Sequence, residues 1–162
     1  MYKKVLTLQT ILLAGGVFIS WTTTLGQFRT FHTLYGTLFR FNDCAIPNPF
    51  VTACFYGAVA FLVAFGWSLW LSLGSENRTG ERYLKNFLLF AVLFAISVLT
   101  YESLEYYKVF SFGGKIITCS PGTPLYTTPC FYGMLFFLTS YFTALVTLRF
   151  VSVKSTIDNL FS

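Results

Sequence analysis

Four cysteines carry the clearest chemical signal in this 162-residue chain. They form two pairs, Cys44 with Cys54 and Cys119 with Cys130, and nine or ten residues separate the members of a pair. Cysteines can exchange disulfides, form structural disulfides or bind metals. Structural zinc sites favour cysteines two to four residues apart, so this spacing predicts no metal site.

The two cysteine stretches are near copies of each other. They read CAIPNPFVTACFYG and CSPGTPLYTTPCFYG. Each reaches a threonine two residues before its second cysteine and closes on Cys-Phe-Tyr-Gly, and a long apolar run follows each. The offset is 75 residues at the first cysteine and 76 at the second. Self-similarity at a nearly fixed offset indicates an internal repeat. We therefore predict a duplicated unit, in which each copy presents one cysteine pair at the mouth of an apolar helix.

The elements that must position these cysteines follow from composition. The chain is 55% hydrophobic and 10% charged, whereas soluble chains are about a quarter charged. At about 20 residues per span, it has room for four membrane helices, which we place at about 5–25, 50–73, 84–104 and 130–150. Backbone groups in lipid must be paired within each helix. The predicted fold is therefore all-α: one integral membrane domain over 1–162, a four-helix bundle made of two tandem parallel helix-hairpin repeats, at about 5–74 and 84–150.

The basic residues predict how the bundle is oriented. Seven Lys and Arg residues flank the termini and the polar connector at 74–82, and four lie in the two cysteine loops. Cytoplasmic segments carry the excess of Lys and Arg. We therefore expect cytoplasmic termini and external cysteine loops in a bacterial-type plasma membrane, with the first apolar run retained as a helix rather than removed as a signal peptide. The net charge of +5 is scattered along the chain rather than clustered, so we expect no nucleic-acid partner.

An external location allows the cysteines to form disulfides that persist. Three pairings are open: 44–54 with 119–130, 44–119 with 54–130, or 44–130 with 54–119. As structural disulfides, the cysteines would close the proline-rich loops. Each disulfide would then stabilise the fold by about 3 kcal/mol on the chain-entropy model. As redox groups, they would exchange disulfides. Cys54 and Cys130 each begin an apolar helix, where the helix dipole favours a thiolate.

The number of helices, the external cysteine pairs and the Pro129-Cys130 step at a helix mouth resemble the DsbB and vitamin K epoxide reductase families of membrane thiol oxidoreductases. This resemblance implies cysteine pairs coupled to a quinone and to a thioredoxin-like external protein. Cys54 and Cys130 would then take the place of a redox centre. Both families use a Cys-x-x-Cys centre, whereas Cys54 and Cys130 are each followed by Phe-Tyr-Gly.

Other polar residues offer less chemistry. His32 is the only histidine, and we place it in the first loop, which we expect at 27–49. Glu102 and Glu105 lie three residues apart on one helix face, and we expect them at the membrane interface, paired with Lys108 or an arginine. The matching region of the first copy, Leu25 to Phe28, carries no acid. No charge is visible at mid-depth, as a proton-coupled carrier would need.

Two classes of function remain. The first is a thiol–disulfide oxidoreductase or electron relay that uses Cys44, Cys54, Cys119 and Cys130. The second is a non-catalytic membrane protein, or a subunit among other membrane subunits, whose loops are held by structural disulfides between the same residues.

Overall fold

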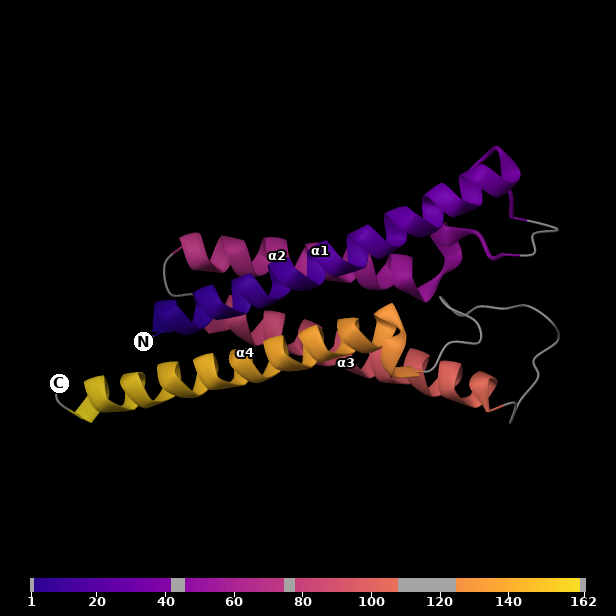
Figure 1. Ribbon diagram of the computed structural model, residues 1–162. Helices are drawn as coiled ribbons and strands as arrows, with labels where there is room; N and C mark the ends of the chain where they lie inside the picture. Colours follow the sequence, from indigo (N-terminus) through magenta and orange to yellow (C-terminus); the bar gives the residue numbers. More distant parts are fainter. Residues whose placement is uncertain (1, 42–45, 75–77, 108–124, 161–162) are drawn as a thin grey trace.

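The computed structural model describes residues 2–41, 46–74, 78–107 and 125–160, and within them all regular structure is helical (Figure 1). The elements are α1 (Tyr2–Tyr35), the 3-10 turn η1 (Pro49–Val51), α2 (Ala53–Leu73), α3 (Arg78–Tyr106), the 3-10 turn η2 (Leu125–Thr127) and α4 (Pro129–Leu160). The four α-helices are long and apolar enough to cross a membrane.

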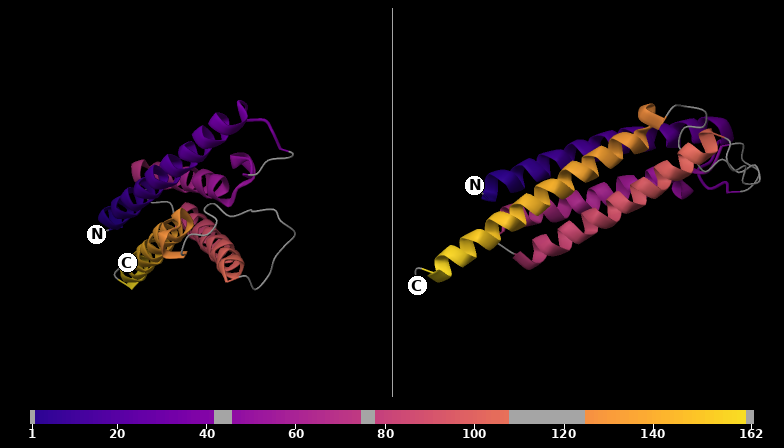
Figure 2. Two further views of the ribbon diagram at one scale, coloured as in Figure 1. Left: turned by 45° about the vertical axis from the view of Figure 1, so that its right-hand side comes forward. Right: turned by 90° about the horizontal axis from the view of Figure 1, so that it is seen from below.

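The helices lie side by side and form a bundle (Figures 1 and 2). Both termini lie at one end, which we call the terminal end; α2 and α4 begin at the other, which we call the loop end. Helix α1 packs extensively against α2 and α4, and α3 packs against α4 and, less closely, α2. The helices α2 and α4 lie diagonally opposite, with only a small contact between them.

Helix α1 is longer than the sequence predicted. It continues past residue 25 to Tyr35, so Arg29 and His32 lie on this helix rather than in a loop. No proline or glycine interrupts residues 27–35. The helix ends at Gly36, which has a φ of 68° and donates its N–H to the carbonyl of His32 at 2.8 Å. Glycine is the usual residue where the backbone turns into the left-handed conformation at the end of an α-helix. Helix α4 also exceeds its predicted end, because it runs to Leu160.

The centre of the bundle contains a pair of stacked rings. Phe61 of α2 and Phe137 of α4 lie 3.8 Å apart between centroids and are nearly parallel, at 8°. Gly16 of α1 allows this arrangement, because a Cβ atom there would overlap the Phe61 ring. At Gly57 and Gly66 of α2, by contrast, a Cβ atom would meet nothing within 4 Å.

Buried positions recur at constant offsets along the chain. Four buried residues of α2 have a buried α4 residue 76 positions later; the pairs are Phe61 and Phe137, Ala64 and Ser140, Ser68 and Ala144, and Leu71 and Thr147. Between α1 and α3 the offset is 75; the buried pairs are Leu6 and Glu81, Gln9 and Leu84, Leu13 and Leu88, Gly16 and Ala91, and Thr24 and Leu99. The two hairpins therefore turn corresponding faces toward the interior.

Candidate functional site

Each hairpin presents one cysteine at the start of a helix, as predicted. Cys54 is the second residue of α2, and Cys130 is the second residue of α4. A 3-10 turn and then a buried threonine, Thr52 or Thr128, precede each helix. The carbonyls of these threonines accept the N–H groups of Phe55 and Phe131, at 3.2 and 3.1 Å. These matching turns therefore hold Cys54 and Cys130 at the same level of the bundle.

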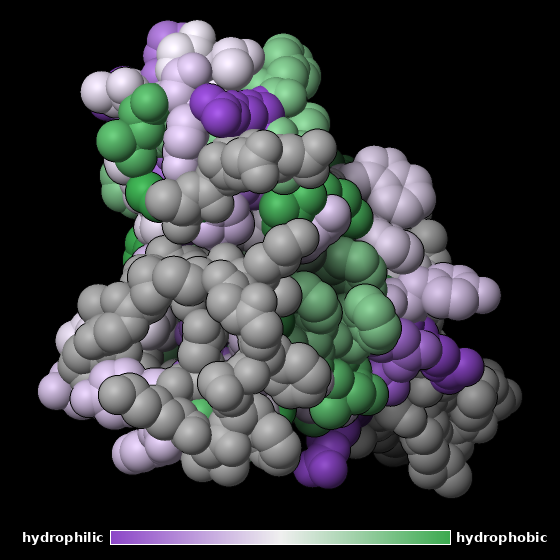
Figure 3. All heavy atoms as spheres, turned by 90° about the vertical axis from the view of Figure 1, so that its right-hand side faces the viewer, coloured by the Kyte–Doolittle hydropathy of each residue, from purple (hydrophilic) through white to green (hydrophobic). Residues whose placement is uncertain are grey.

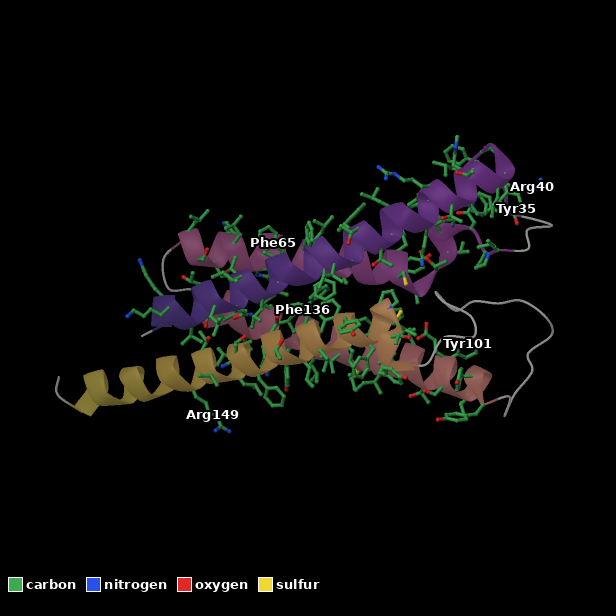
Figure 4. All side chains as sticks on the ribbon, in the orientation of Figure 1. Tyr35, Arg40, Phe65, Tyr101, Phe136 and Arg149 are labelled. Carbon is green, nitrogen blue, oxygen red and sulfur yellow. The ribbon has the colours of Figure 1, made fainter. Side chains whose placement is uncertain are left out.

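The two cysteines meet across the bundle. The Sγ atoms of Cys54 and Cys130 lie 3.7 Å apart, and both residues are partly buried. Figure 4 shows sulfur atoms, in yellow, at the facing ends of α2 and α4. A disulfide bond is about 2.05 Å long, so the two sulfurs are in contact but are not bonded to each other. Cys130 is present as a thiol. The other predicted site residues, Cys44 and Cys119, lie outside the described residues.

A pocket opens beside these sulfurs, and all four helices line it. Its walls are apolar and include Phe94 of α3 and the Phe61 and Phe137 rings, with Cys54, Cys130 and the hydroxyl-bearing Thr23 of α1 among them. Small-molecule sites in proteins have a mostly apolar lining of this kind. The sulfurs therefore face a space with apolar walls.

Glu102 of α3 is buried, with only 7% of its side chain exposed. The sequence carried a sign of this burial, because Leu88, Leu99 and Glu102 recur on one face of the helix. Lys108, the basic partner that we expected for it, lies outside the described residues.

The loop end beside the site is ordered by polar and aromatic contacts. The buried Asn48 donates from Nδ2 to the carbonyls of Leu38 at 2.8 Å and Arg40 at 2.9 Å, and its Oδ1 accepts the Phe50 N–H at 3.0 Å. The Phe50 ring packs edge-on against Phe28 of α1, with 4.8 Å between centroids. Figure 3 looks onto this end, where hydrophobic side chains show between hydrophilic ones. These contacts fix the segment that enters α2.

The geometry supports chemistry at sulfur. Two sulfurs in contact can form a disulfide or pass one to another thiol. Among the described residues, no group of three His, Cys, Asp or Glu side chains is arranged to hold a metal ion. Comparison of the chain with protein-family models, with curated proteins and with solved structures found no match.

Proposed function

We propose that this chain is an integral membrane protein, built by tandem duplication, that carries out thiol–disulfide exchange at Cys54 and Cys130. Four helices of spanning length support the membrane location. The duplication is supported by the two matching hairpins. Their cysteines lie 76 residues apart in sequence, and the same offset relates the 3-10 turns, the helix starts and the buried faces of α2 and α4.

The single observation that carries the exchange chemistry is the 3.7 Å separation of the two sulfurs. Cys54 is disulfide-bonded and Cys130 is a free thiol, so this contact sets a thiol against a disulfide sulfur, as exchange requires. The pair also lies beside an apolar pocket. A redox pair needs both properties, because its sulfurs must bond to each other without a large backbone movement and must be reachable by a reactant.

The exchange step is a displacement at sulfur. The step starts from Cys54 already held in a disulfide, with either a loop cysteine (Cys44 or Cys119) or the cysteine of a thioredoxin-like external protein as its partner. The Cys130 sulfur, losing its proton, attacks the Cys54 sulfur. The Cys54–Cys130 bond forms, the bond to the other thiol breaks, and that thiol leaves with the electron pair and regains a proton. The partner that leaves Cys54 is reduced to a thiol, and the Cys54–Cys130 pair is oxidised to a disulfide, so electrons balance.

The fold allows a direct test, because Cys54 and Cys130 lie on opposite sides of the connector between α2 and α3. A protease site inserted at residues 75–77 would cut the chain into two halves, which only a disulfide can hold together on a denaturing gel. We would place this site in a variant in which Cys44 and Cys119 are serine and equilibrate the membranes in thiol–disulfide buffers of set potential. We expect the link between the halves to titrate between about −150 and −270 mV, the range of known carriers.

The matched control is the same chain with Cys54→Ser, whose halves should separate at every potential. Halves that never link would show that the pair does not form a disulfide and would remove the proposal. A link that persists below about −300 mV would identify a structural disulfide. That outcome supports the second candidate, a non-catalytic membrane protein or subunit. The position of the two cysteines on diagonally opposite helices suits it, because a bond there would fasten one hairpin to the other.

A further inference from the structure

The two hairpins meet at two interfaces, α1 with α4 and α2 with α3, and these differ in how closely they pack (Figure 1). Gly15 of α1 receives the Phe136 ring of α4, because a Cβ atom at Gly15 would lie 3.1 Å from that ring. The repeat offsets of 75 and 76 residues relate this pair to Phe90 of α3 and Ala60 of α2. Phe90, however, is 69% exposed, and α3 packs less closely on α2 than α1 does on α4. The ring that closes the first interface therefore has no counterpart closing the second.

The pocket beside the sulfurs reaches this looser interface. Phe94 of α3 lines the pocket and is also 41% exposed, and it lies about one helical turn from Phe90. Large apolar side chains are exposed along the same stretches of both helices; these are Val59, Leu62 and Val63 on α2 and Phe90 and Leu93 on α3. In a membrane, lipid tails would cover these side chains. The pocket therefore borders a surface that faces lipid in the proposed location.

The walls of the pocket suit an alkyl chain better than a polar ligand. Gly57 and Gly133 line it about one turn past the two cysteines, and a Cβ atom at Gly57 would meet nothing within 4 Å. Ser20 and Thr23 of α1 bring hydroxyl groups to the wall, but each already donates to a carbonyl of its own helix, at 3.1 and 3.0 Å. Apart from the two cysteines, the other described wall residues are apolar or glycine. A ligand with carbonyl groups, such as a quinone, would compete with these helix carbonyls for the hydroxyl hydrogens.

We propose that an acyl chain of a bilayer phospholipid enters between α2 and α3, occupies this pocket and lies against Cys54 and Cys130. This inference rests on the membrane location within the proposed function. An apolar cavity offers water no hydrogen-bond partners, whereas an alkyl chain needs none. The acyl chain covers the sulfurs on the side of the bilayer. The thiol partner of the exchange therefore reaches them from the loop end.

The test uses the full-length protein in vesicles of phosphatidylethanolamine and phosphatidylglycerol that contain a phospholipid with a photoactivatable diazirine in one acyl chain. Mass spectrometry locates the adducts. We expect pocket adducts, at Met134 and Phe137, as well as adducts at Phe90 on the outer surface. Gly57→Leu should lower the pocket adducts about tenfold or more and leave those at Phe90 unchanged, since the leucine displaces several buried CH₂ groups of the acyl chain. The matched control is Gly66→Leu, on the same helix but away from the pocket, which should change neither.

Adducts at Phe90 without pocket adducts would overturn the inference, as would pocket adducts that Gly57→Leu leaves unchanged. If a quinone with an isoprenoid tail, added at a low mole fraction, removes the pocket adducts, the pocket prefers that ligand and the inference also fails. Should Gly57→Leu fail to fold, Ala95→Leu narrows the pocket from α3 and takes its place. The absence of adducts at Phe90 as well would count against the membrane location itself. The link between the halves is measured without the lipid probe, so the exchange proposal can hold where this inference fails.

Discussion

At position 16 the bundle has no room for even a methyl group. Gly16 of α1 faces the Phe61 ring, and that ring cannot move aside because it is almost fully buried and stacked on Phe137. We expect Gly16→Ala to lower the free energy of unfolding by about 1–3 kcal/mol, the usual cost of overpacking. Thermal unfolding of the protein in detergent would measure the change.

Gly66 of α2 provides the control for this substitution. A Cβ atom there would meet nothing within 4 Å, and alanine is favoured over glycine within a helix by about 0.5–1 kcal/mol. Gly66→Ala should therefore leave stability unchanged or raise it. Equal destabilisation by both substitutions would show that helix α1 does not approach Phe61 as closely as the structure indicates.

The sequence could predict which cysteines begin helices but not which sulfurs meet. The apolar runs that follow Cys54 and Cys130 are visible as patterns, and both helix starts were placed to within a few residues. Which sulfurs lie in contact depends on how α2 and α4 are rotated about their axes, and all three pairings were equally compatible with the predicted repeat. The inward position of Glu102 depends in the same way on the rotation of α3.

At the scale of elements, Asn48 holds the segment that leads into η1 and α2. Its three hydrogen bonds join Leu38, Arg40 and Phe50, and the side chain is buried. Asn48→Ala leaves two carbonyls and one N–H without this partner, at a cost of about 1–3 kcal/mol if they stay buried. We expect the segment to open more often, so that trypsin cuts after Arg40 about tenfold faster or more.

Mass spectrometry of the cleaved protein would report this rate at Arg40 alone. Asn86→Ala is a suitable control, because Asn86 is exposed on α3 and remote in sequence from the loop. If trypsin cuts both variants at the rate of the unaltered protein, Asn48 does not hold the segment. The Asn48 contacts were beyond sequence analysis, since they join residues eight and ten positions apart through a turn that has no periodic pattern.

The number and approximate positions of the long helices were predictable, whereas several of their ends were not. A run of apolar residues is long enough to set each helix by itself. The end of α1 instead depends on local contacts: Phe31 is almost fully buried, and its ring lies 4.7 Å from that of Tyr35. These contacts stabilise helical turns in a segment whose polar composition had indicated a loop.

At the scale of the whole molecule, large apolar side chains cover the outside of the bundle. Phe18, Trp70 and Phe90 are each more than 60% exposed. A protein surrounded by water rarely exposes so many large apolar groups, whereas lipid tails would cover them. The interior, by contrast, holds buried polar groups such as Gln9 and Ser68. This distribution fits helices that face lipid outward and one another inward.

The orientation of the bundle in the membrane links its charge to its proposed chemistry. Lys3, Lys4 and Arg82 lie near the ends of the helices at the terminal end, and this excess of basic residues predicts that the terminal end is cytoplasmic. The loop end, with Cys54 and Cys130, would then face the oxidising side of the membrane, where disulfides persist.

Two exposed threonines at opposite ends of the bundle allow this orientation to be measured. In a cysteine-free background, we expect a membrane-impermeant maleimide to label Thr37→Cys in intact cells, because Thr37 is exposed at the loop end. Thr79→Cys, exposed at the terminal end, should be labelled only after the cells are lysed. The opposite pattern would place Cys54 and Cys130 on the reducing cytoplasmic side. A disulfide between them would not persist there, and the exchange proposal would lose its physical basis.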